Sequence, residues 1–151
     1  MRWLKAGTVI GVGLGGFADG IALHQIAQWH NMGSAVLPPV TMEAMSRNMV
    51  WDGLFHAAVW WVTGLGIVLL WRALRERGTR VPGRAFAGAL LAGWGLFNLL
   101  EGLIDHHLLQ LHHVYERAGL SSWDWLFLAS GAALIAAGWF MVASGSRRSG
   151  H

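Results

Sequence analysis

The residues best suited to chemistry are concentrated in one apolar stretch, residues 98–114, which reads NLLEGLIDHHLLQLHHV. A charged or imidazole side chain at membrane depth is costly, and such residues usually face a protein interior with a partner. Six of them in one segment are far more than packing requires. They are Glu101, Asp105, His106, His107, His112 and His113. The stretch therefore predicts a functional site inside a membrane helix.

The elements that must position these side chains are four apolar segments. We place them at about residues 3–30, 49–72, 85–114 and 123–143, each long enough for the roughly 20 residues that a spanning helix needs. Only helices satisfy their own backbone in lipid at this length. We therefore expect an all-α integral membrane protein with four transmembrane helices, all 151 residues forming a single four-helix membrane domain.

An internal repeat relates the two halves of the chain. The segment DGIALHQIAQWHN, residues 19–31, aligns without gaps on EGLIDHHLLQLHH, residues 101–113. The paired polar residues are Asp19 with Glu101, His24 with His106, His30 with His112 and, in two further matching segments, Asp52 with Asp124. We predict two tandem helical hairpins related by a pseudo-two-fold axis along the membrane normal. Because polar residues match best, the repeat favours one site shared by both hairpins.

The basic residues predict an orientation. Only Arg47 and Arg117 fall on one side of the predicted helices, and the rest fall on the other. The positive-inside rule puts that larger group, and with it both termini, in the cytoplasm. The group consists of Arg2, Lys5, Arg72, Arg75, Arg77, Arg80, Arg84, Arg147 and Arg148. Since these residues form short juxtamembrane patches, the net charge of +3 does not indicate a nucleic-acid partner.

Imidazole and carboxylate groups without a thiolate indicate the class of metal. The chain has no cysteine, and its His and carboxylate side chains suit zinc, iron or manganese, while imidazole alone also suits copper. We predict one transition-metal ion or a dinuclear pair, with zinc first and copper or iron close behind. The candidate metal ligands are His24, His56, His106, Asp105, Asp52, His30, His107, His112 and His113. Glu101 and Asp19 are the candidate catalytic general bases.

Regular α-helical geometry divides these groups into two layers. The eleven residues from Glu101 to His112 would span roughly 16 Å, too far for one metal ion to bind both. The deeper layer comprises Asp19, His24, His56, Glu101, Asp105 and His106, and the outer one His30, Asp52, His112, His113 and Asp124. We expect the deeper layer to be functional and His56 to complete it.

Two classes of function fit these residues. One is a membrane metalloenzyme, hydrolytic or oxidative, acting on a lipid or small molecule from the outer leaflet of the bilayer. The other is a metal-handling or respiratory accessory protein for zinc or copper, for which Met42, Met45 and Met49 could be a capture surface or simply an apolar helix face. A b-type cytochrome with His24 and His106 as axial ligands is a third alternative. A homo-oligomer is left open.

Three segments together resemble a known family. They are GFADGIALHQIAQWHNM, NMVWDGLFH and NLLEGLIDHHLLQLHHV, beginning at residues 16, 48 and 98, and they resemble the domain-of-unknown-function 2243 family of predicted four-helix bacterial membrane proteins. The resemblance covers nearly the whole chain except its last several residues. It implies a bacterial membrane protein with a shared polar core, but no activity. With the charge distribution, it predicts a multi-pass protein of the bacterial cytoplasmic (inner) membrane.

Overall fold

The structure is a computed structural model, and it describes residues 1–148, with side chains up to residue 145. Within these residues the chain is all-helical, without a strand. Its elements are α1 (Arg2–Asp19), η1 (Gly20–Ile26), α2 (Met42–Leu74), α3 (Gly83–Glu101), η2 (Gly102–Leu108), η3 (Glu116–Ala118) and α4 (Ser122–Arg148). The predicted all-α fold class is confirmed.

Four helices are long and apolar enough to cross a membrane. They are Arg2–Ile26, Met42–Leu74, Gly83–Leu108 and Ser122–Gly145, which confirms the predicted number of spans. Their limits differ from those expected: the first and third end at Ile26 and Leu108 rather than near residues 30 and 114. The second begins earlier, at Met42, because the Thr41 side chain accepts a hydrogen bond from the backbone N–H of Ala44 and caps the helix.

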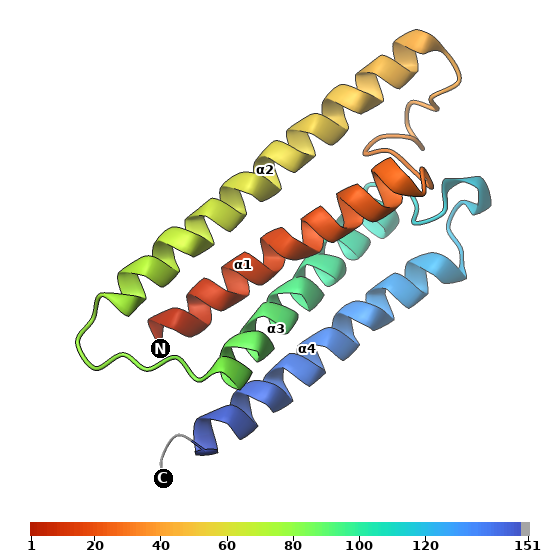
Figure 1. The fold of residues 1–151 in the computed structure, drawn as a ribbon. Coiled ribbons are helices and arrows are strands. Elements are labelled where there is room, and N and C mark those ends of the chain that lie inside the picture. Colours follow the sequence, from red (N-terminus) through yellow and green to blue (C-terminus); the bar gives the residue numbers. More distant parts are fainter. Residues whose placement is uncertain (149–151) are drawn as a thin grey trace.

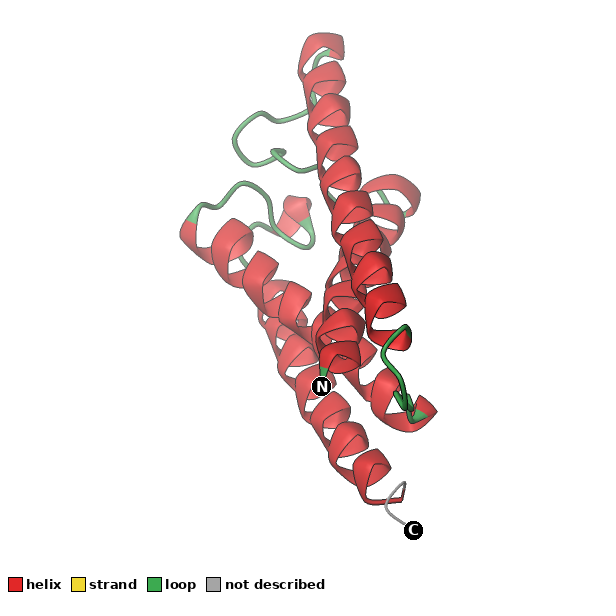
Figure 2. Ribbon diagram, turned by 90° about the vertical axis from the view of Figure 1, so that its left-hand side faces the viewer, coloured by secondary structure: helices red, strands yellow, loops and turns green. Residues whose placement is uncertain are grey.

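The helices lie in the spatial order α2, α1, α3, α4 (Figure 1). α1 packs against α2 and α3, and α3 packs against α4, while α1 makes no contact with α4 in residues 1–148. In the apolar stretch of each span, 44% of the residues are buried inside the protein in the two central spans, which contain α1 and α3. The corresponding share is 11% in the spans that contain α2 and α4. The two flanking helices therefore turn most of their apolar surface outward, as helices surrounded by lipid do. Figure 2 shows the same helical bundle from the side.

The central pair depends on glycine at its closest approach. A Cβ atom on Gly11 would overlap the backbone carbonyl of Leu90, and one on Gly93 would overlap that of Thr8. Small residues allow two helix backbones to meet in this way. The crossing fixes how the far ends of α1 and α3 face each other.

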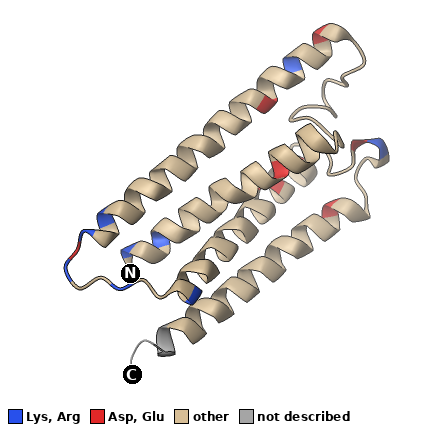
Figure 3. Cartoon of the chain, viewed as in Figure 1, with Lys and Arg blue, Asp and Glu red and all other residues tan. Residues whose placement is uncertain are grey.

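Charged side chains gather toward the two ends of the molecule (Figure 3). Basic residues cluster where α1 begins, α2 ends and α3 begins, because these three points lie at one end of the fold (Figure 1). The side chains of Arg147 and Arg148 lie outside the described part. Carboxylates, by contrast, are concentrated toward the opposite end, where η1 and η2 end the two central helices.

Candidate metal centre

The two central helices both widen into a π-helical turn at the same repeat position. In a regular α-helix, residues five apart point about 140° away from each other. The wider i→i+5 turns η1 and η2 bring such residues onto one side. As a result His24 Nε2 lies 3.1 Å from Asp19 Oδ2, and His106 Nε2 lies 3.3 Å from Glu101 Oε1.

After each π-helical turn the chain reverses direction. Gln28 and Gln110 adopt positive φ angles of 51° and 50°, in the left-handed region that ends many helices. The reversals carry His30 and His112 back over the helix ends. His112 Nε2 therefore lies 2.9 Å from Glu101 Oε1, so the 16 Å separation expected from a continuous helix, and the division into two layers that rested on it, are wrong.

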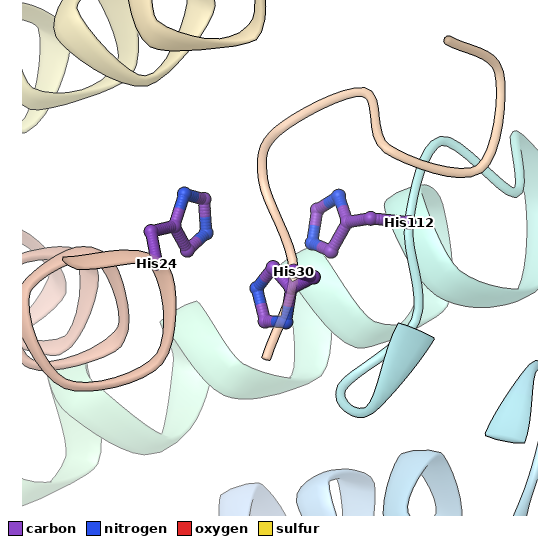
Figure 4. Close-up of side chains that lie close together, drawn as sticks. All are labelled: His24, His30 and His112. Carbon is purple, nitrogen blue, oxygen red and sulfur yellow. The ribbon is translucent and has the colours of Figure 1, made fainter. Parts of the chain in front are cut away.

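Four imidazole rings meet at this point, which we call the histidine cluster: His24, His30, His106 and His112. The rings of His30 and His112 are stacked with their centroids 4.5 Å apart. His24 packs edge-on against His30 at 4.4 Å, and His106 packs edge-on against His112 at 4.9 Å. Figure 4 shows three of these rings, His24, His30 and His112, gathered from separate segments.

Asp52 and Asp124 orient two of the imidazoles. Asp52 Oδ1 lies 2.9 Å from His24 Nδ1, and Asp124 Oδ1 lies 3.3 Å from His106 Nδ1. Each carboxylate is in turn held by backbone N–H donors, that of Met32 for Asp52 and those of Val114 and Ser121 for Asp124. These carboxylates therefore direct Nε2 of His24 and His106 toward Asp19 and Glu101. Carboxylates in such positions commonly orient metal-binding histidines.

Backbone carbonyls orient the other two imidazoles. His30 Nδ1 donates to the carbonyl of Val114 at 2.9 Å, and His112 Nδ1 donates to that of Met32 at 3.2 Å. The sequence repeat aligns His30 with His112 and Met32 with Val114. In both contacts, therefore, the histidine of one hairpin donates to the equivalent carbonyl of the other hairpin. Such equivalent contacts are what a pseudo-two-fold axis would produce, although the axis itself stays a prediction.

The surroundings shift the pKa values of His30 and His112 in opposite directions. Burial, together with the neighbouring His112 and His24, lowers the pKa of His30 to about 2, so His30 is neutral. Burial also disfavours the charged form of His112, but the hydrogen bond to Glu101 and the charge of Glu101 outweigh it. The pKa of His112 is therefore raised above its ordinary value.

Buried polar atoms without a hydrogen-bond partner are concentrated here. Of nine such side-chain atoms in the described part of the chain, seven belong to this site: Asp19 Oδ1 and Oδ2, His24 Nε2, His30 Nε2, Glu101 Oε2, and His106 Nδ1 and Nε2. A buried polar atom left unpaired costs about 1–3 kcal/mol. Together with His112, residues of this site form two overlapping groups that could hold a metal ion, His24–His30–His112 and Glu101–His106–His112.

Four of the sequence-predicted site residues, His56, His107, His113 and Asp105, are not part of the histidine cluster. His56 Nδ1 donates to the carbonyl of Asp52 in its own helix, and His107 Nδ1 donates to that of Gly102. His113 Nδ1 lies 3.7 Å from Asp124 Oδ1, and the Asp105 side chain makes no hydrogen bond within the described residues. Their roles as ligands stay predictions.

Sequence reasoning did not include Asp124 among its candidate ligands or bases, although a signal for it was present. The segments WDGLF and WDWLF align Asp52 with Asp124, which is the pair that holds Nδ1 of His24 and His106. The carbonyls of Met32 and Val114 had no sequence signal, because their position depends on the reversal of the chain.

Comparison with known families places the chain. The model of a family described as predicted membrane protein (DUF2243) matches residues 6–145. The chain belongs to this family. The match covers most of α1 and α4, all of α2 and α3, and every residue of the histidine cluster. Neither the curated proteins nor the solved structures contain a significant match. The family description adds a membrane location but no activity, so any chemistry must be argued from the site.

Proposed function

We propose that this protein is a membrane metalloprotein in which both hairpins bind transition-metal ions. The proposed centre consists of the histidine cluster with Asp19 and Glu101. The observation that carries the proposal is the group of seven buried atoms that make no hydrogen bond within the described residues, on residues no more than 6% exposed. Four of them make only ion-pair contacts of 3.1–3.3 Å, and Asp19 Oδ1, His30 Nε2 and Glu101 Oε2 have no contact of either kind. Native proteins rarely leave buried polar atoms unsatisfied, and an ion bound here would satisfy several of them together.

Hydrogen-bond chemistry gives a second argument. A carbonyl can only accept, so Nδ1 of His30 and of His112 must each carry the proton. In a neutral ring Nε2 then has a free lone pair. On His112 that lone pair would face a carboxylate oxygen of Glu101 at 2.9 Å, and two acceptors at this distance require a cation between them. Either a proton or a metal ion meets that need.

The distances between donor atoms suit a metal. With metal–nitrogen bonds of about 2.0–2.1 Å, neighbouring donors lie about 3.3 Å apart around a tetrahedral ion and about 2.9 Å apart around an octahedral one. The contacts of Glu101 Oε1 with His106 and His112, at 3.3 and 2.9 Å, fall in this range. So does the 3.1 Å contact of Asp19 with His24.

The number of donors favours two ions. Each hairpin supplies one carboxylate and two histidines: Asp19, His24 and His30 from the first, Glu101, His106 and His112 from the second. The two groups of donors within reach of one ion share His112, so Asp19 would take the place of His112 in the group of His24 and His30 when both ions are bound. One octahedral ion would use all six and have no open position. Two ions with three protein donors each would keep an open position for water or substrate, the arrangement typical of catalytic zinc.

We therefore propose a membrane metalloenzyme. A bound ion would lower the pKa of its water or bind a substrate oxygen, which supports hydrolysis with zinc and oxidation with iron or copper. Zinc is our first choice.

Metal handling is a second candidate, supported by a different observation. Met42, Met45 and Met49 are 81%, 44% and 65% exposed along α2. Thioether sulfur is a soft ligand that suits copper(I). These residues could pass copper to the cluster through the surface formed by Met49 and His56. A saturated, single-ion centre would favour this function over an enzyme.

A b-type cytochrome is not favoured by the arrangement. His30 and His112 pack between His24 and His106, at centroid distances of 4.4 to 6.3 Å, and fill the space that a haem would need. Both ring nitrogens of His24 and of His106 also already face carboxylates.

The distribution of charge supports an orientation, which we also propose. The end of the fold that carries most basic residues would face the cytoplasm, and the metal centre would lie in the outer half of the bacterial inner membrane (Figure 3). A substrate would then come from the outer leaflet or the space outside it.

X-ray absorption of the purified, metal-loaded protein tests the proposed ligands. We expect nitrogen and oxygen neighbours at about 2.0–2.1 Å, with the outer-shell scattering of imidazole rings. Loss of that imidazole scattering in His30→Ala and His112→Ala, but not in His107→Ala, would support the assignment. Sulfur neighbours, or imidazole scattering that only His107→Ala removes, would contradict it.

A further inference from the structure

The water-facing side of the proposed centre is closed by the two loops that carry His30 and His112. The loops are joined by backbone hydrogen bonds, from Ala35 to Leu111 at 3.0 Å and from Glu116 to Trp29 at 3.1 Å. The Trp29 ring also packs against Tyr115 and Trp123, at 5.4 and 5.2 Å. The Ser34 hydroxyl donates to Glu116 beneath them. A molecule approaching from water therefore meets a covered site.

A crevice opens from the side instead, between α1 and α4 and above α3. Its volume is about 230 Å³. It is lined by Gly15, Ala18, Asp19, Ala22, Leu23, Trp94, Asn98 and Phe127. These residues belong to membrane-spanning segments, so the crevice faces the lipid and not the water.

Asp19 connects the crevice to the centre. Its side chain is part of the crevice wall, yet the residue is only 5% exposed and neither carboxylate oxygen accepts a hydrogen bond within the described residues. Oδ2 lies 3.1 Å from His24 Nε2. On the opposite wall the Phe127 ring lies 5.3 Å from that of His106. The crevice thus touches the proposed centre directly at Asp19 and is separated from His106 by the Phe127 ring.

We propose that this crevice is the route by which a small, neutral, lipid-soluble molecule reaches the metal centre from within the bilayer. The inference rests on the proposed function. Apart from Asp19, the only strongly polar side chain of the lining is Asn98, whose amide is already engaged by Ser130 at 2.9 Å. An anion entering here would lose its hydration and meet only the Asp19 carboxylate, whereas an apolar molecule has little hydration to lose.

The test uses cobalt(II)-substituted protein, whose visible spectrum responds to a new ligand, and two probes. At about pH 8.5, well above the pKa of an imidazole, 1-butylimidazole is neutral and lipid-soluble, whereas azide is charged and water-soluble. Ala22→Trp places a large ring in the crevice, while Ala57→Trp adds the same ring to an exposed position on α2 outside every described groove. We expect 1-butylimidazole to bind about tenfold more slowly to Ala22→Trp, equivalent to ~1.4 kcal/mol of added barrier, and at the wild-type rate to Ala57→Trp.

Several outcomes would overturn the inference. Unchanged binding of 1-butylimidazole by Ala22→Trp would exclude the crevice as the route, and azide binding faster than 1-butylimidazole would indicate a route from water. If Ala22→Trp does not fold, Ala18→Phe blocks the same crevice from the next turn. A wild-type protein that retains no cobalt would instead refute the metal centre itself, so the two failures are distinguishable.

Discussion

At the scale of single residues, the chemistry of the site depends on which ring nitrogen is left free. Each imidazole of the histidine cluster has Nδ1 directed at a carboxylate or a carbonyl, which leaves Nε2 toward the centre. All four rings therefore present the same nitrogen, Nε2, although carboxylates orient two of them and backbone carbonyls orient the other two. This common orientation is what a ligand set needs and what packing alone does not require.

Removing a ligand should release metal. We expect His30→Ala and His112→Ala to bind metal more than about 100-fold more weakly, since losing a ligand costs more than losing an outer hydrogen-bond partner. His107→Ala and His113→Ala are matched controls from the same stretch of chain and should retain it. Competition with a chromophoric chelator measures the affinities. Retention by the first pair and loss by the controls would assign the site to the wrong histidines.

Removing an orienting carboxylate should weaken binding less. Asp52→Asn and Asp124→Asn keep an acceptor for the backbone N–H groups but lose the charge beside His24 and His106. We expect affinity to fall about 10–100-fold without loss of folding. Glu43→Gln, an exposed change on α2, provides the control. Unchanged affinity in both variants, measured by the same competition, would show that these carboxylates only hold the loops.

At the scale of elements, the sequence predicts the helices but not their ends. Apolar length gave the four spans, and the polar repeat gave the pairs Asp19–Glu101 and His24–His106. The π-helical turns and the reversals at Gln28 and Gln110 could not be predicted in this way, because glutamine is not a usual residue at positive φ. Extending a regular helix through these points placed His112 far from Glu101, whereas the two lie 2.9 Å apart.

The crossing of α1 and α3 should be sensitive to one methyl group. Gly11→Ala would push against the Leu90 carbonyl, and overpacking of this kind costs about 1–3 kcal/mol. A change of 1 kcal/mol shifts the unfolding midpoint of a chain of this size by roughly 2–4 °C. We expect a lower midpoint, by thermal unfolding in detergent, for Gly11→Ala. Gly64→Ala, where an added Cβ meets nothing within 4 Å, should not lower it. Equal midpoints would refute the close approach.

At the scale of the whole molecule, the account requires the two ends to lie in different compartments. The chain has no native cysteine, so single cysteines report position directly. Arg77→Cys lies in the exposed connection between α2 and α3, and Val40→Cys lies at an 86% exposed position before α2. We expect a membrane-impermeant thiol reagent to label Val40→Cys in cells with a permeable outer surface, and Arg77→Cys only after lysis. The reverse pattern would put the proposed centre on the cytoplasmic side.

The most direct measurement is the metal content of the protein purified in detergent and washed with a weak chelator. Elemental analysis by mass spectrometry should find about two transition-metal ions per chain, zinc first, because six protein donors give each ion three ligands and an open position. A combined His30→Ala, His112→Ala variant should lose them, whereas a combined His107→Ala, His113→Ala variant should not. A wild-type protein that is folded but free of transition metal would contradict the central claim.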